Sequence, residues 1–129
     1  MKEYDYSLTY VEAEDYFIHR FTGAINIDTI FSAMSQLRQH ASFCDTVPVL
    51  WDIREVDTEK LTQEAMWQFE LQVRQKVPSS KRNARIAYLI ATELQFAVAR
   101  QFITLAGWSD NEYIITRSMD EANTWLRPD

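Results

Sequence analysis

One short apolar run restricts the fold of this chain more than any other feature of its sequence. Residues 47–53 read Val-Pro-Val-Leu-Trp-Asp-Ile, a run rich in β-branched and aromatic side chains that gives way to charge at Asp52 and Arg54. Segments with helical periodicity flank the run on both sides. A short apolar run in this setting is typical of a strand buried on both faces. It therefore predicts the central strand of a mainly parallel sheet.

The residues before this run predict an antiparallel hairpin. Tyr4–Val11 alternates aromatic or aliphatic side chains with polar ones, and Tyr16–Thr22 alternates again after the polar turn Glu12–Asp15. A period of two indicates a strand with one face toward solvent. Two such strands joined by a short turn form a hairpin.

Helical spacing and capping residues predict four helices. Asn26 or Asp28 caps the first, and Thr62 caps the second. The third spans Leu94–Ala106 and ends before a glycine, which is a common residue just past a helix C-terminus. Ser118 stands three residues before a glutamate, the spacing of a capping box, and begins the closing helix.

Two more apolar runs, Arg85–Ala91 and Tyr113–Thr116, predict the remaining strands. Strand-helix-strand units require right-handed parallel crossovers. The sequence therefore predicts an α/β fold with a mixed five-stranded sheet and four helices, in which the N-terminal hairpin is antiparallel and the β-α-β units are parallel. We expect residues 1–129 to form a single domain.

Composition excludes several functional classes. The net charge of −6 argues against a nucleic-acid groove, and the 2 glycines leave little room for a phosphate-binding loop. One cysteine and 2 histidines predict neither a disulfide nor a metal centre, and we expect no cofactor. No apolar run approaches the ~20 residues of a membrane-spanning helix, and the N-terminus has no apolar leader. We expect a cytoplasmic protein.

A polar ligand site is one hypothesis for the carboxyl edge of the sheet, where open α/β sheets bind ligands. The alternative is structural, because the threonine and serine there also suit helix capping and the charged pair marks the exit of a strand from the core. The residues predicted to gather at this edge are Asp52, Arg54, Thr92, Arg117 and Ser118.

The third helix carries apolar residues on nearly all sides, so it must bury more than one face. The second face would be covered by another element of the chain such as the closing helix, by a second subunit or by an apolar ligand. Apolar residues of the second helix outside its core stripe extend the same surface. The residues predicted to meet a partner are Phe96, Ala99, Ile103, Trp67 and Leu71.

The chain resembles the SpoIIAA-like family of small bacterial proteins, which is related in fold to STAS domains (anti-sigma-factor antagonists) and to CRAL-TRIO lipid-binding domains. The resemblance covers nearly the whole chain, and its C-terminal tail is the most specific part. The segments that carry it are Phe21–Gly23, Val49–Asp52, Arg85–Tyr88, Phe96–Arg100 and Ser118–Leu126.

This resemblance implies a non-catalytic module. STAS relatives bind a partner protein and are switched by phosphorylation of a serine at the start of the helix after the central strand. The corresponding places here are Thr58 and Thr62, although this sequence has neither the STAS spacing nor the glycine that follows the switch residue. We therefore expect a binding or regulatory module that contacts a protein partner or forms a homodimer. The alternative is a carrier of a lipid or another small apolar molecule.

Overall fold

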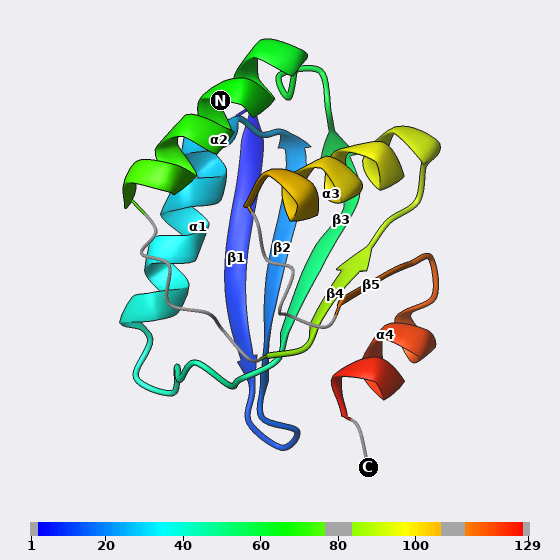
Figure 1. The fold of residues 1–129 in the computed structure, drawn as a ribbon. Coiled ribbons are helices and arrows are strands. Elements are labelled where there is room, and N and C mark those ends of the chain that lie inside the picture. Colours follow the sequence, from blue (N-terminus) through cyan, green and yellow to red (C-terminus); the bar gives the residue numbers. More distant parts are fainter. Residues whose placement is uncertain (1–2, 77–83, 107–112, 128–129) are drawn as a thin grey trace.

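The computed structural model of the chain (Figure 1) describes residues 3–76, 84–106 and 113–127. Its strands and helices follow one another in the predicted order. The strands are β1 (Tyr4–Val11), β2 (Tyr16–Ala24), β3 (Val49–Asp57), β4 (Ile86–Leu89) and β5 (Tyr113–Thr116), and the helices are α1 (Ile27–Gln39), α2 (Gln63–Lys76), α3 (Glu93–Ala106) and α4 (Met119–Leu126).

The strands form one five-stranded sheet in the order β1-β2-β3-β4-β5. β1 and β2 pair antiparallel, and every later neighbour pairs parallel. The mixed sheet, its four helices and the central place of β3 confirm the predicted fold. β3 is buried along most of its length because it has a neighbouring strand on each side and helices on both faces.

β3 is longer than the sequence predicts. The apolar run that predicts this strand ends at Ile53, yet residues 55–57 also belong to β3 and pair with Thr22, Gly23 and Ala24 of β2. The register between the two strands shifts between Arg20 and Thr22, so pairing continues past an irregularity in the ladder. A β-bulge of this kind depends on the partner strand and leaves little trace in local sequence.

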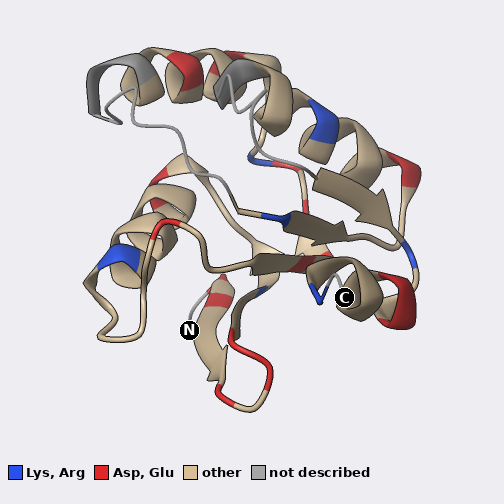
Figure 2. Ribbon diagram, turned by 60° about the horizontal axis from the view of Figure 1, so that its bottom comes forward, with Lys and Arg blue, Asp and Glu red and all other residues tan. Residues whose placement is uncertain are grey.

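The helices are divided unequally between the two faces of the sheet. Successive right-handed crossovers move in one direction along the sheet, so α1, α2 and α3 all pack on one face. α4 lies on the opposite face, over β3, β4 and β5 (Figures 1 and 2). The part of that face formed by β1 and β2 carries polar residues such as Ser7, Thr9 and Arg20, which are exposed.

The larger core lies under the three helices and is rich in aromatic rings. Trp51 of β3 stacks on Tyr88 at a centroid distance of 6.0 Å and lies 4.3 Å from the ring of His19. Phe69 of α2 meets Phe102 of α3 edge-on at 4.9 Å, which joins these two helices. None of the helices in the described residues is both long and apolar enough to cross a membrane.

Candidate functional site

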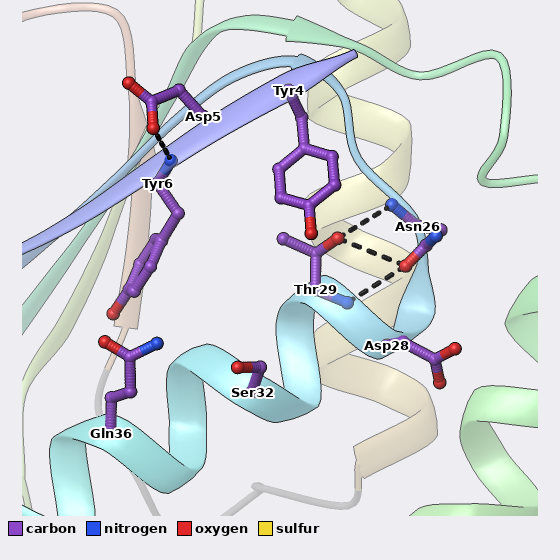
Figure 3. A pocket seen from close by; sticks show the side chains of 8 residues that line it. All are labelled: Tyr4, Asp5, Tyr6, Asn26, Asp28, Thr29, Ser32 and Gln36. Atoms are coloured by element: carbon purple, nitrogen blue, oxygen red, sulfur yellow. Dashed lines mark hydrogen bonds between the residues drawn. The ribbon is translucent and has the colours of Figure 1, made fainter. Parts of the chain in front are cut away.

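A hollow of about 630 Å³ lies between the edge strand β1 and helix α1 (Figure 3). Tyr4 and Tyr6, two residues apart on β1, direct their rings toward α1 and border the space, because alternate side chains of a strand point to the same face. Ser32 and Gln36 line it from the helix, and Asp28 stands at its end in the first helical turn. The lining combines carboxylate, amide and hydroxyl groups with the carbon atoms of two tyrosine rings.

Beneath this hollow, Tyr6 is joined to a buried histidine. The Tyr6 hydroxyl and Nδ1 of His19 form a hydrogen bond of 2.6 Å. His19 is completely buried between Tyr6, Phe21 and Trp51. Burial raises the pKa of the Tyr6 hydroxyl well above its usual value, so this group stays protonated at neutral pH. The pair fixes the position of the Tyr6 ring at the wall of the hollow.

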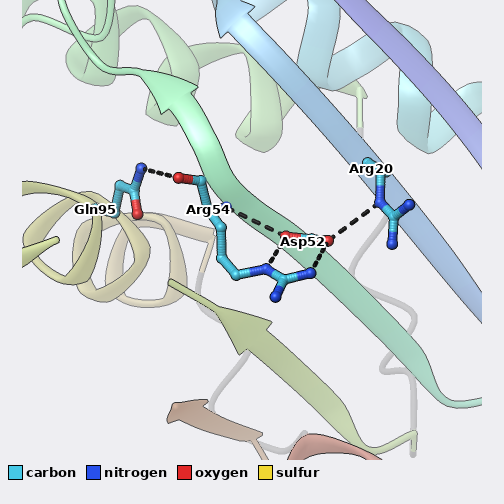
Figure 4. Close-up of polar contacts among 4 residues, drawn as sticks. All are labelled: Arg20, Asp52, Arg54 and Gln95. Atoms are coloured by element: carbon cyan, nitrogen blue, oxygen red, sulfur yellow. Dashed lines mark hydrogen bonds and ion pairs between the residues drawn. The ribbon is translucent and has the colours of Figure 1, made fainter. Parts of the chain in front are cut away.

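The predicted pair Asp52 and Arg54 forms a polar cluster on the face of the sheet that carries α4 (Figure 4). One Asp52 oxygen accepts from Nε of Arg54 at 3.0 Å, and the other accepts from its Nη2 at 3.0 Å. The same carboxylate accepts from Nε of Arg20 at 3.2 Å. Only 6% of the Asp52 side chain is exposed, against 53% for Arg20 and 41% for Arg54.

Opposing effects act on the charge of Asp52. Burial would by itself raise the pKa of this carboxyl, because a charged group loses hydration. The hydrogen bonds from the side chain and N–H of Arg54, together with the charges of Arg54 and Arg20, outweigh burial, and the pKa lies below its usual value. Asp52 is therefore ionised at neutral pH, and its hydrogen bonds are occupied by this chain's own arginines.

Thr92 caps α3 and forms a capping box with Gln95. Oγ1 of Thr92 accepts from the Gln95 N–H at 3.1 Å, and Oε1 of Gln95 accepts from the Thr92 N–H at 3.2 Å. The same Oε1 accepts from Ala91 N–H at 2.7 Å. Nε2 of Gln95 donates to the carbonyl oxygens of Arg54 and Val56, at 3.1 Å each. The buried Gln95 thus attaches the start of α3 to the end of β3.

The two other residues predicted at this edge, Ser118 and Arg117, and the two predicted phosphorylation positions, Thr62 and Thr58, also make contacts within the chain. Oγ of Ser118 caps α4 by accepting from Glu121 N–H at 3.1 Å, and Oγ1 of Thr62 caps α2 by accepting from Ala65 N–H at 3.1 Å. Arg117 pairs with Glu93 at 3.2 Å on the surface, where both side chains are largely exposed. Thr58 lies just beyond β3, and its carbonyl accepts from Leu61 N–H.

The predicted polar site therefore divides into two groups. Asp52 and Arg54 lie on the surface of the sheet with Arg20, whereas Thr92, Arg117 and Ser118 lie where strands pass into helices. Gln95 links the two groups, because its side chain donates to the Arg54 carbonyl and its N–H donates to Thr92. Helix capping and pairing within the sheet, the structural alternative to a ligand site, account for each of these hydrogen bonds.

A surface of a different kind lies on the two neighbouring helices α2 and α3. Four large apolar side chains are exposed there: Trp67 (60%), Leu71 (40%), Leu94 (69%) and Phe96 (41%). Trp67 and Leu71 are one helical turn apart and share one side of α2, whereas Leu94 and Phe96 are two residues apart and point to different sides of α3. We use the name α2–α3 apolar face for these four exposed residues, of which Trp67 and Leu71 form the pair that one partner can contact together. Two further residues predicted for an interface, Ala99 and Ile103, are only 0% and 8% exposed because they pack in the core of this chain. Their side chains are therefore not accessible to a partner.

Sequence reasoning did not identify Arg20, the His19–Tyr6 pair or the hollow beside β1. The contact of Arg20 with Asp52 depends on the register of β2 and β3, in which these two residues are partners. The hollow depends on the angle between α1 and β1. The one local signal was the alternation of Tyr4, Tyr6, Leu8 and Tyr10, which placed aromatic rings on one face of a terminal strand.

Comparison with known proteins identifies the fold. No protein-family model matches the chain, and no curated protein does. Among solved structures, an uncharacterized protein of the DUF3478 family from Shewanella loihica PV-4, which has a SpoIIAA-like fold, is similar to it. The TM-score is 0.59 at 16% sequence identity, and the match covers 98% of this chain and 95% of the other. The SpoIIAA-like fold suggested by the sequence is confirmed.

Proposed function

Starting from this SpoIIAA-like fold, we propose that the protein is a non-catalytic binding or regulatory module that acts through protein contacts made by the α2–α3 apolar face. Nothing in the described part of the chain points to catalysis. The observation that carries the proposal is the exposure of Trp67 and Leu71 one helical turn apart on α2, a helix that packs against α3. Soluble proteins rarely leave several large apolar side chains exposed together unless they meet a partner.

Self-association is the simplest form of this contact. A two-fold dimer would place the same residues of both copies against one another and would remove Trp67 from water. Tryptophan is also among the residues that contribute most to binding at the centre of interfaces. Exposed Trp67 and Leu71 lie one helical turn apart, so a facing helix can contact both.

Sedimentation equilibrium of three variants tests this form. We expect the wild type to be a dimer, Trp67→Glu to be a folded monomer, and Gln68→Glu to remain a dimer. Gln68 is the matched control because it is exposed on the same helix and is already polar. Circular dichroism checks that every variant is folded.

If the wild type is a monomer, the face must bind another protein. A photoreactive amino acid at position 71 should then crosslink one partner in cells, and Trp67→Glu in the same chain should abolish that adduct. A monomeric wild type that yields no such adduct would contradict the proposal.

The carrier alternative requires an apolar space that can hold a ligand. The hollow beside β1 is lined about equally by polar and apolar atoms, and a second hollow of about 550 Å³ beside Trp125 is mostly apolar but open to solvent. Neither combines the apolar lining with the enclosure that small-ligand pockets usually have. Native mass spectrometry distinguishes the two functions, because a carrier should retain a lipid after purification and a protein-binding module should not.

The phosphorylation switch remains a prediction, and the structure favours Thr62 over Thr58 as its position. Thr62 is exposed at the N-terminus of α2, where a phosphate would meet free backbone N–H groups and the positive end of the helix. Thr58 is half-buried. Mass mapping after incubation with cell extract should find phosphate on Thr62, and Thr62→Ala should remove it.

A further inference from the structure

β1 is the edge strand beside the hollow, and no other strand of the described ranges pairs with its outer side. The Ala24 N–H donates to the Glu3 carbonyl at 3.1 Å, and the register of the hairpin continues from this pair. Because hydrogen-bonding direction alternates along an antiparallel strand, the N–H and C=O groups of Tyr4, Tyr6, Leu8 and Tyr10 point away from β2. Within the described residues no strand pairs with that side.

One donor of this edge is already covered by a neighbouring side chain. Oδ1 of Asp5 accepts from the Tyr6 N–H at 2.9 Å (Figure 3), which agrees with an outward direction for this group. A charged side chain on an edge strand discourages pairing with unrelated strands. The Asp5 carboxylate thus occupies the position that the carbonyl of an added strand would take.

The hollow extends this edge into a groove. A strand added to β1 would direct alternate side chains toward the α1 side, where Tyr4 and Tyr6 border the space above Ser32 (Figure 3). Main-chain hydrogen bonds would hold the added strand, and the hollow would select one of its side chains.

The charge of the groove identifies the kind of side chain. Asp5 and Asp28 contribute carboxylates to the lining, and none of the described residues that line it is a lysine or an arginine. Lys60 approaches the start of β1, but it is paired with Glu3. Aromatic faces also attract cations, so two tyrosine rings and two carboxylates favour a basic side chain.

We propose that a partner protein adds an extended peptide segment, with lysine or arginine at alternate positions, to the open edge of β1 and places one basic side chain in the hollow. A second copy of this chain suits the edge less well, because its own β1 would bring another Asp5 toward the carboxylates already there. This surface is separate from the α2–α3 apolar face, and the inference does not depend on that face.

A displayed library of random peptides of 8 residues, the length of β1, tests the proposal when it is selected on the full chain. The selected peptides are titrated into isotope-labelled protein, and amide shifts are followed by NMR. We expect the peptides to be rich in lysine and arginine and to shift the amides of Tyr4, Tyr6, Leu8 and Tyr10. Trp67→Glu should bind them as tightly as the wild type does.

Two pairs of variants test two contributions to peptide binding, the negative charge of the groove and the main-chain hydrogen bonds of the strand edge. Asp28→Lys should weaken binding about tenfold, whereas Asp120→Lys, at the same position in the first turn of α4, should leave it unchanged. Leu8→Pro removes an outward N–H without removing a bond to β2, so it should also weaken binding about tenfold. Its control, Leu8→Val, keeps that N–H. Circular dichroism confirms that each variant is folded.

Several results would overturn the proposal. These are no enrichment over the unselected library, selection of acidic or uncharged peptides, amide shifts confined to α2 and α3, or equal binding by Leu8→Pro and Leu8→Val. Shifts of the β1 amides that depend on protein concentration, without peptide, would assign the edge to a second copy.

Discussion

At the scale of single residues, Asp52 shows how this sheet holds a charge on its surface. Its carboxylate is nearly covered, yet both arginines that neutralise it are about half exposed. The exposed arginines keep part of their hydration, which lowers the cost of the ion pairs. The cluster therefore gives β2 and β3 a polar connection on the part of the sheet face that α4 does not cover.

We predict that Asp52→Asn lowers the free energy of unfolding at pH 7 by about 1–2 kcal/mol, because charge-assisted hydrogen bonds to Arg54 and Arg20 are weakened. The folded-state pKa of Asp52 lies below its usual value. Its stabilisation is thus fully present above the unfolded-state pKa, about 4, and is lost as the pH falls through the lower folded-state pKa.

Urea denaturation across this acid range measures the effect. The difference in stability between wild type and Asp52→Asn should shrink as the pH falls below about 4. Glu55→Gln, on an exposed residue of the same strand, is the control and should stay near wild type. A constant difference at all pH values would show that the Asp52 charge contributes nothing.

At the scale of elements, α3 combines a core stripe with an exposed apolar surface. Ala99, Phe102 and Ile103 pack against the sheet and α2, whereas Leu94 and Phe96 remain on the surface. Apolar character all around a helix indicates more than one buried face, but it does not say which residues the parent chain covers. Packing of α3 against β3 and α2 decides that division.

The buried and the exposed apolar residues of α3 should respond differently to substitution by glutamate. Ile103→Glu buries an unpaired carboxylate, so we expect it to lose about 3–5 kcal/mol of stability, enough to unfold much of a marginally stable domain. Phe96→Glu should change the stability by about 0.5 kcal/mol or less, because its side chain is exposed. Thermal denaturation compares them, and equal losses would contradict the placement of α3.

At the scale of the whole molecule, the two faces of the sheet are covered very differently. Three helices and most of the aromatic rings cover one face. On the other face, α4 is the one helix among the described residues, and it covers a small cluster that includes Leu50, Leu89, Ala122 and Leu126. A single short helix at the end of the chain should open more easily than the larger layer, because fewer apolar contacts hold it.

This asymmetry predicts two kinds of unfolding. Phe69→Ala, in the larger core, should cost about 3–5 kcal/mol and increase amide exchange throughout the sheet and helices. Leu126→Ala should cost about 2–4 kcal/mol by equilibrium measurement, with the increase in exchange concentrated in α4. Hydrogen exchange measured by mass spectrometry checks this, and uniform acceleration in Leu126→Ala would contradict it.

Part of the candidate sites could be predicted from local sequence. Thr62, Thr92 and Ser118 were expected to cap helices and do so, since a capping bond joins residues only three apart. The contact between Arg20 and Asp52 joins two strands and needs their register. The hollow beside β1 and the burial of Ile103 likewise depend on elements far apart in the chain.

The sequence by itself determined the kind and order of the elements, because alternation, helical spacing and capping are properties of neighbouring residues. It also determined that the second strand joins the third by a parallel crossover. Only the tertiary structure decided the length of β3, the covered side of α3 and the open edge of β1. These depend on which distant surfaces pack together, and a shift of one residue in a strand register exchanges its buried and exposed side chains.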